Sequence, residues 1–485
     1  MIKKLLVAGA LMTGMVSCTN DFEEINKNPN VPTEDKVAAE YLFTTALATT
    51  HPTGVWQYRL NSLGTEVMAF HTIDAFGNAT NYGTNSRGWV AEYWRQSYQL
   101  VVNPLVSAYK IVDAGEATDK NQLKAIINTW KAYYFHRMTD MYGDIPFSEA
   151  GRVDEGIYKP KFDRQADIYA TLISELGDAV DTLEIARGNT STFGTQDILF
   201  DGEYEKWYRF ANSLRLRLAT RWGDTQAVNE ALSKDLIDQV GFNVADRFDS
   251  SDGISDGENT NGDYVALAWG EANKPTAAML NIMQNRNADP TDDDPRLMRY
   301  FVKGTDSLGV EVGYKSIITG ADYTGAYSNS EYTTINPDYI FGRITPALIM
   351  DAGEVYFLKA EALLVTDITA AKEAYKMGVN ASLEYYDLDS DVETSYPEFW
   401  SVLSANFDTN PKEAIITQKW VALFSNGPEA YAEIRRTGYP TFVEGEDYVG
   451  SGQMPTRIDY PDFEYTSNGD NATSAASNTS GFWWD

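Results

Sequence analysis

The chain has 485 residues and a formal net charge of −31 at pH 7, because 70 acidic side chains stand against 39 basic ones. Such a surface repels nucleic acid, and no Lys/Arg-rich run offsets the repulsion, so the charge argues against a nucleic-acid partner. Hydrophobic residues make up 43% of the chain and aromatic residues 13%, enough to bury a large core, which excludes an intrinsically disordered protein.

A short apolar segment at the N-terminus ends at Cys18, the only cysteine of the chain. It follows two lysines and is too short to span a bilayer, which is typical of a signal peptide. Met15-Val16-Ser17-Cys18 resembles the lipobox of bacterial lipoproteins, in which the cysteine is acylated after cleavage. We therefore predict a signal peptide over 1–17 and an acylated tether, carrying palmitate or a similar chain, over 18–35. The alternative is an ordinary secretion signal followed by an unrelated cysteine. Cleavage would change the formal charge to −33 (−31 − 2).

Apolar residues recur at spacings of three and four through much of the chain, which is the pattern of amphipathic helices. The segment 121–142 shows it most clearly, and its helix should end at Gly143, just before Pro146. The same period predicts helices over 89–112, 165–184, 204–222, 354–364, 370–384 and 411–425. Because these helices come in pairs separated by short breaks, we interpret them as tetratricopeptide-like repeats, although no clean 34-residue repeat is visible.

Two long stretches, 241–345 and 437–485, show little period of either kind and are rich in Gly, Asn, Asp, Tyr and Pro. We expect long loops or short hairpins there, and binding residues are often carried on such loops. No Pro/Ser-rich linker divides the chain, so we predict a single domain over 36–485. Its helical scaffold would lie mainly in 36–240 and 346–436, with a loop-rich lobe in the two remaining stretches.

Seven strings of residues, in this order behind Cys18, resemble the SusD/RagB family of outer-membrane nutrient-binding lipoproteins, most closely its second large branch. The strings are Asp21-Phe22-Glu23-Glu24-Ile25-Asn26 with Asn28-Pro29-Asn30; Met141-Tyr142-Gly143-Asp144-Ile145-Pro146-Phe147-Ser148-Glu149-Ala150; Lys206-Trp207 with Phe210-Ala211-Asn212-Ser213-Leu214-Arg215-Leu216-Arg217; Asp294-Pro295-Arg296-Leu297; Glu354-Val355-Tyr356-Phe357-Leu358-Lys359-Ala360-Glu361-Ala362; Gln418-Lys419-Trp420; and Arg435-Arg436-Thr437-Gly438-Tyr439-Pro440. The resemblance extends from Cys18 to the C-terminus.

The resemblance implies a mainly α fold in which tetratricopeptide-like helix pairs form a right-handed superhelical scaffold beside an irregular lobe with a few short strands. It further implies a cell-surface lipoprotein on the outer membrane of a Gram-negative bacterium. Members of this family bind oligosaccharides without cleaving them and deliver them to a SusC-like TonB-dependent transporter, as part of polysaccharide utilisation. One branch handles peptides, so capture of a peptide on the same scaffold is the alternative.

Most of these strings also have a structural interpretation, which we favour. Gly143 can end a helix, Asp144 can accept hydrogen bonds from nearby backbone N–H groups, and Pro146 fixes the turn that follows. Arg215 and Arg217 point in different directions on a helix, so we expect at least one of them to bind a carboxylate in the core. The last string indicates a helix that ends at a glycine.

Little in the sequence favours catalysis. Residues 253–257 fit the pattern G-x-S-x-G, but they lie in an Asp/Gly/Asn run without the strand and helix that a nucleophile elbow requires. The three histidines, His51, His71 and His136, include no H-E-x-x-H motif, which argues against a zinc site. We therefore predict a protein that is not an enzyme, with a glycoside hydrolase as the less favoured alternative, since so many carboxylates always include a suitable pair.

No cofactor is predicted. Two Asp-rich stretches, 249–263 and 289–294, could bind calcium through hard oxygen ligands, but neither has the EF-hand spacing. Solvated loop carboxylates in Asn/Gly-rich turns are the simpler interpretation.

Two loop regions carry the residue types that bind sugars. A pyranose stacks its C–H face on an aromatic ring, while planar amide, carboxylate or guanidinium groups bind its hydroxyls. The first region is 71–89, and the second combines 262–269 with 314–339. The predicted contacts are Phe76, Asn78, Asn81, Tyr82, Arg87, Trp269, Asp322, Tyr323, Tyr327 and Tyr332. Alternatively, these aromatic rings pack only against their own loops.

Overall fold

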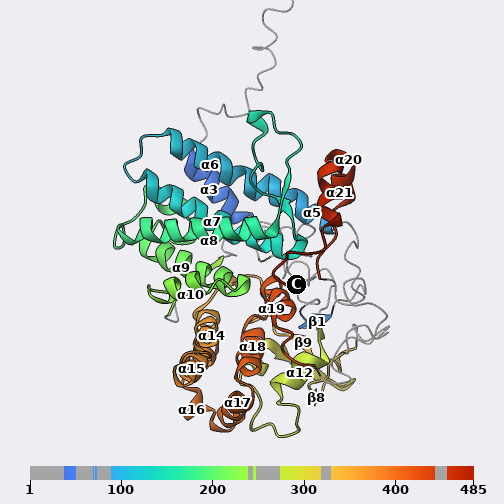
Figure 1. Cartoon of the computed structure of the whole chain (residues 1–485). Helices are drawn as coiled ribbons and strands as arrows, with labels where there is room; N and C mark the ends of the chain where they lie inside the picture. Colours follow the sequence, from blue (N-terminus) through green and yellow to red (C-terminus); the bar gives the residue numbers. More distant parts are fainter. Residues whose placement is uncertain are drawn as a thin grey trace, which may run out of the picture.

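The chain is mainly helical, as the apolar periodicity predicts (Figure 1). The computed structural model describes residues 38–50, 69, 71–73, 89–238, 244–246, 261, 274–317, 329–442 and 456–485. The predicted signal peptide, Cys18 and the tether lie outside these residues, so their assignment stays a prediction. Among the described helices, none is both long and apolar enough to cross a membrane.

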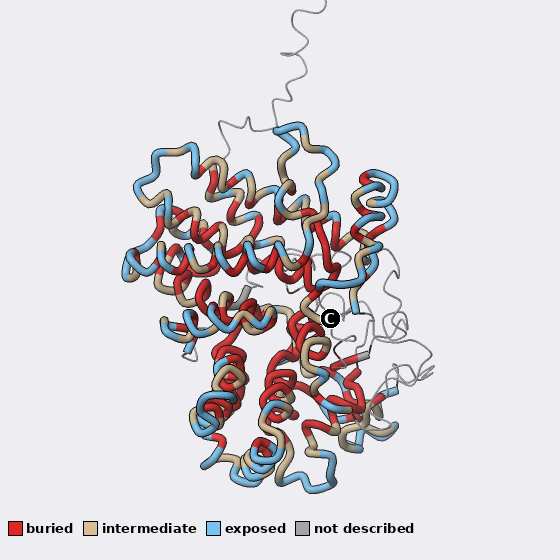
Figure 2. The backbone as a smooth tube through the Cα atoms, viewed as in Figure 1, coloured by how far each residue is buried: buried red, intermediate tan, exposed pale blue. Residues whose placement is uncertain are grey.

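The first group of helices packs in chain order, α6 against α7, α7 against α8, and α8 against α9, which is the paired arrangement that we expected. The central helix α7 is buried along most of its length, because apolar and aromatic residues cover most of its surface (Figure 2). It ends at Gly143, as predicted, with a φ of +78° that favours glycine. The bounds are α3 Ala39–Ala48, α5 Trp89–Gln96, α6 Asn103–Ala114, α7 Lys120–Tyr142, α8 Gln165–Glu184, α9 Tyr204–Trp222 and α10 Thr225–Leu232.

The segment predicted as one helix over 89–112 consists of α5, a π-helical stretch (η4) over Ser97–Val102, and α6. Pro104 lies in the first turn of α6. Because proline has no backbone N–H, it cannot donate the hydrogen bond that a continuous α-helix needs at that position, and the helical register changes just before it.

Asp144 has more distant partners than we expected. Its Oδ1 accepts a hydrogen bond from the backbone N–H of Gln165, at the start of α8, at 2.9 Å. Its Oδ2 accepts one from Nδ2 of Asn478, at 2.7 Å. One donor is a backbone N–H, as predicted, but it lies 21 positions away and the other donor is a side chain. This carboxylate stabilises the N-terminus of α8 and holds the C-terminal segment beside it.

The second group of helices carries its own stop and start signals. Pro397, Pro411 and Pro428 each occupy the first turn of a helix, where a missing N–H costs nothing. The last helix of the group ends at Gly438, with a φ of +71°, as the sequence predicts. The bounds are α14 Ala352–Leu363, α15 Ile368–Tyr385, α16 Val392–Ser395, α17 Pro397–Thr409, α18 Pro411–Ala422 and α19 Gly427–Thr437.

The described strands are short and pair two by two. All five pairs are antiparallel, namely β1 with β5, β2 with β3, β4 with β10, β6 with β9 and β7 with β8. Their bounds are β1 Thr72–Ile73, β2 Ile145–Pro146, β3 Phe162–Asp163, β4 Val244–Asp246, β5 Lys274–Pro275, β6 Phe301–Val302, β7 Gly304–Thr305, β8 Glu311–Gly313, β9 Thr334–Ile335 and β10 Ala347–Met350. Short hairpins were expected in the loop-rich lobe, and β7–β8 is one.

The two stretches predicted as loops also contain helices, which corrects the prediction. They are α12 Ala277–Met283, α13 Leu297–Tyr300, α20 Asp462–Ser467 and α21 Gly469–Ser477. Tertiary contacts fix the last two: Trp94 donates its indole N–H to Glu464 Oε1 at 2.9 Å, and Asn468 donates to the carbonyl of Pro160 at 2.8 Å. Such contacts leave no local periodicity in the sequence.

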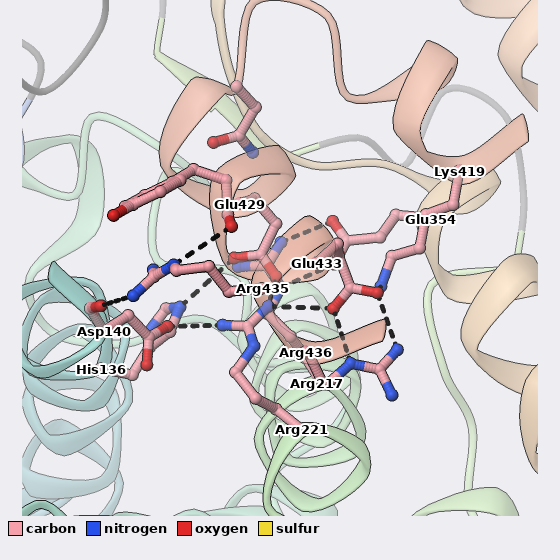
Figure 3. A network of polar contacts seen from close by, with 12 residues as sticks. His136, Asp140, Arg217, Arg221, Glu354, Lys419, Glu429, Glu433, Arg435 and Arg436 are labelled. Atoms are coloured by element: carbon pink, nitrogen blue, oxygen red, sulfur yellow. Dashed lines mark hydrogen bonds and ion pairs between the residues drawn. The ribbon is translucent and has the colours of Figure 1, made fainter. Parts of the chain in front are cut away.

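A buried network of ion pairs joins the two groups of helices (Figure 3). Arg217 of α9 donates from Nε and Nη2 to the two carboxylate oxygens of Glu354 of α14, both at 2.6 Å. One turn later, Arg221 pairs with Asp140 of α7 at 2.6 Å and with Glu429 of α19. The prediction that one arginine of the α9 string binds a core carboxylate is confirmed by Arg217. Together, Arg217 and Arg221 link α9 to α7, α14 and α19.

The network continues into α18 and α19. Lys419 of α18 lies 3.2 Å from Glu433 of α19, and Arg436 pairs with both Glu433 and Glu361 at 2.7 Å. Burial raises the pKa of Glu433, but the nearby cations Arg436 and Lys419 outweigh it and hold that pKa well below its usual range. These charges therefore fix α18 against α19, and α18 supports the segments described next.

Candidate functional site

Of the ten predicted ligand contacts, only Tyr332 belongs to the described part of the chain. The remaining contacts lie outside it and stay predictions: Phe76, Asn78, Asn81, Tyr82, Arg87, Trp269, Asp322, Tyr323 and Tyr327. The G-x-S-x-G match at 253–257 and His51 also lie outside. The structure does describe residues at the ends of the segments that contain these contacts, and it shows which of these ends lie close together.

The ends of three polar, aromatic segments meet in the structure. In β1 and β5, Ile73 pairs with Lys274, and next to them Thr276 forms a bridge with Ile317. These residues flank the segments 74–88, 262–273 and 318–328, which contain all the predicted contacts except Tyr332. The structure therefore brings together, at their ends, the two loop regions that the sequence could only treat separately.

A clamp from α18 holds β1 in place. His71 is fully buried, and its Nε2 lies 2.9 Å from the carbonyl oxygen of Trp420. The indole N–H of Trp420 donates in turn to the carbonyl of Ala69 at 2.8 Å, and the rings of His71 and Trp420 lie 4.5 Å apart. Trp420 belongs to the string Gln418-Lys419-Trp420, so this string has a structural role that positions the first loop region.

Tyr332 lies close to the third flank. Thr333 exchanges hydrogen bonds with Lys315, accepting at Oγ1 from its N–H at 2.8 Å and donating to its carbonyl at 3.1 Å. The ammonium of Lys315 lies 4.3 Å from the centre of the half-buried Tyr332 ring and 3.0 Å from Glu331. The hydrogen bond with Glu331 raises the pKa of Lys315, so a cation is held over the ring.

Lys274 is a residue of interest that the sequence reasoning missed. The residue is 2% exposed, and its ammonium forms no hydrogen bond or ion pair with any described residue. Burial lowers its pKa, because a low dielectric disfavours the charged form. It lies where the flanks meet, but a single lysine before a proline gives no signal in the sequence.

The carboxylates of the stretch 289–294 serve the local fold. Asp289 accepts hydrogen bonds from the backbone and hydroxyl of Thr291, and Asp294 pairs with Arg296 in the core at 2.6 Å. Within the described residues, no three His, Cys, Asp or Glu side chains are arranged to hold a metal ion.

Comparison with known families matches residues 29–461 to SusD-like_2, described as "Starch-binding associating with outer membrane". A solved chitin-binding protein superposes with a TM-score of 0.74 at 24% identity, covering 92% of this chain and 99% of its own. A chitin-binding SusD homologue from Flavobacterium johnsoniae gives 0.72 at 25% identity, covering 92% and 97%. A SusD homologue from Bacteroides vulgatus gives 0.72 at 23% identity, covering 89% and 93%. None of the curated proteins matches the chain.

Proposed function

Because the chain belongs to the SusD-like family of outer-membrane-associated, starch-binding proteins, we propose that it captures oligosaccharides at the cell surface without cleaving them. Delivery to a SusC-like TonB-dependent transporter would follow, with a lipid on Cys18 keeping the protein at the outer membrane. The mainly helical scaffold and the match over nearly the whole chain support this assignment.

One observation carries the proposal, namely the meeting of the three segment ends at β1, β5 and Ile317. It brings together the described residues at which the segments containing Tyr82, Trp269 and Tyr323 begin or end, and this supports a shared binding region. Aromatic platforms surrounded by amide and carboxylate groups suit a neutral sugar, whose two faces differ in polarity.

The first ligands to test are oligomers of N-acetylglucosamine, since two of the similar solved structures are named as chitin-binding. Starch-type oligosaccharides come next, because the family description names starch. A peptide remains the alternative ligand, and it would favour a groove or a strand edge over stacking rings.

One described carboxyl group, that of Asp351, has a pKa that would suit acid catalysis, but its position does not. Burial raises the pKa of Asp351 to about 7, which is the range of a general acid. That side chain is 4% exposed and accepts a hydrogen bond from the N–H of Glu354 at the start of α14. It is a helix cap in the core and has no access to a substrate.

The test uses the soluble form that begins at residue 18, with Cys18→Ser. We expect it to bind oligosaccharides on an array that also carries peptides, and to release no new reducing ends from them after incubation. Binding to peptides alone would favour the alternative ligand, and released reducing ends would show a hydrolase. Labelled palmitate should mark the full chain in cells and should not mark its Cys18→Ala variant.

A further inference from the structure

A pocket of about 550 Å³ opens between α6, α7, α8 and the segment that joins α7 to α8. All its lining residues are described, and none belongs to β1, β5 or the segments that they flank. In Figure 1 these three helices lie in the upper half of the molecule, whereas α12 and β8 lie near its lower end. The pocket is thus separate from the site proposed above.

Aromatic rings form one wall of this pocket. Phe135 of α7 and Phe147 meet edge to face, with ring centres 4.8 Å apart. The ammonium of Lys131 lies 5.5 Å from the centre of Phe147, and that of Lys124 lies 5.1 Å from Tyr109 of α6. Phe147 and Tyr109 are half-buried, so each ring is held by neighbours and still borders the cavity. Fixed rings of this kind can stack on a sugar.

The cations along the pocket already have partners. Lys131 lies 2.7 Å from Glu175, and Lys110 lies 2.8 Å from Asp154. Arg152 donates from Nε to Glu155 at 2.9 Å. No lining cation is thus left unpaired to bind an anion, and the charge of −31 on the chain opposes anionic ligands in general.

Two lining groups have no partner. The amide of Asn128 on α7 and the carboxylate of Asp167 on α8 form no hydrogen bond or ion pair with any described residue. Asn128 offers two donors and an acceptor, and Asp167 offers acceptors only. Together they can bind hydroxyl groups of a neutral ligand, which both donate and accept.

A second hollow of about 440 Å³ continues the first, sharing Asn128 and Glu175 with it. Its other lining groups include Gln122 of α7 and Thr182 of α8. From Asp167 to Thr182 the trough follows α8 for about 22 Å, at about 1.5 Å per residue. A linear ligand with hydroxyl groups along its length fits this arrangement better than a single small molecule.

We propose that this trough is a second binding site, which takes a neutral linear oligosaccharide stacked on the rings at its wide end. The inference rests on the proposed function only for the class of ligand. A second site on the same chain would hold a long glycan while its other end occupies the loop site, which increases the overall affinity through effective concentration.

The test combines two pairs of substitutions. Asn128→Ala with Asp167→Ala removes the two unpartnered groups, and the fold should persist with only the small loss of stability expected from removing an exposed acidic residue in the first turn of α8. Tyr82→Ala with Trp269→Ala addresses the loop site. Ser174→Ala, an exposed position on α8 that does not line the trough, is the matched control. Chitohexaose and maltohexaose are titrated into each soluble variant by calorimetry, and circular dichroism checks the fold.

We expect two binding events per chain for at least one of these glycans. The Asn128/Asp167 variant should weaken one event by about tenfold or more, as expected when anchoring contacts are removed, and Ser174→Ala should change neither. A single event that the loop variant abolishes and the Asn128/Asp167 variant leaves intact would overturn the second site but not the proposed function. Absence of any glycan binding would overturn both. Binding of a peptide at the trough, in place of a glycan, would overturn this inference.

Discussion

The bidentate pair of Arg217 and Glu354 offers a direct test of how the two groups of helices are held together. Both side chains are 1% exposed, and the substitution Glu354→Gln keeps the shape of the side chain but removes its charge. The guanidinium of Arg217 then lies in the core with Glu429, at 3.5 Å, as its nearest remaining carboxylate. Removing one partner of a buried pair typically costs about 3–5 kcal/mol, because it leaves a desolvated charge uncompensated.

We expect a loss of about that size in the free energy of unfolding, measured by urea titration with tryptophan fluorescence and by calorimetry. Arg215→Gln is the matched control on the same helix, since Arg215 pairs with Glu230, which lies at the surface. It should cost less than Glu354→Gln, because Glu230 is 46% exposed and water screens its charge. The double variant Arg217→Met with Glu354→Leu should regain much of the lost stability. If Glu354→Gln costs no more than Arg215→Gln, our interpretation of the network is wrong.

Three further predictions follow from single residues. Burial raises the pKa of Asp351 to about 7 in the folded chain, so between about pH 4 and pH 7 the folded state holds a proton that the unfolded state has released. This group therefore lowers the free energy of unfolding as pH rises through that range. Urea titrations across the range should show a smaller decrease of that free energy in Asp351→Asn, and the same pH dependence in both chains would contradict the assignment. Gly143→Ala should lower the melting temperature more than Gly156→Ala. Both glycines have a positive φ, but a Cβ added at Gly143 would lie 2.6 Å from Phe482, whereas one at Gly156 would meet open space. Equal decreases of the melting temperature would mean that the contact with Phe482 is easily relieved. Lys274→Met should maintain or raise the melting temperature, because it removes a buried ammonium without a described partner; a clear decrease would indicate a partner for that ammonium.

Much of the helical scaffold could be predicted from the sequence, because long helices with a broad apolar face carry a strong period. The helix predicted over 121–142 is α7 at Lys120–Tyr142, and both glycine stops, Gly143 and Gly438, were correctly placed. These features depend on residues close together in the chain. The partner of Arg217 could not be predicted, because Glu354 is 137 positions away and nothing local distinguishes it from other glutamates.

The helix α19 was predicted only by its glycine end, and its buried residues show why its start was not predicted. Its buried residues include Glu429 and Glu433, which occupy positions where an amphipathic pattern would have apolar side chains. The sequence therefore appears polar at a place where ion pairs with Arg221 and Lys419 fill the core. The two loop regions were predicted, but the meeting of their ends was not. It depends on long-range pairing of very short strands and one bridge, which leave no periodicity to detect.

The measurement that tests the proposed glycan capture most directly is calorimetric titration of the soluble chain, beside its Tyr82→Ala/Trp269→Ala variant, with the best oligosaccharide from the array. We expect the wild-type chain to bind, and the variant to lose at least about tenfold in affinity at the loop site, because two stacking anchors are removed while the melting temperature stays the same. Undiminished affinity in a folded variant would contradict the assignment of these segments as the place where the glycan is captured.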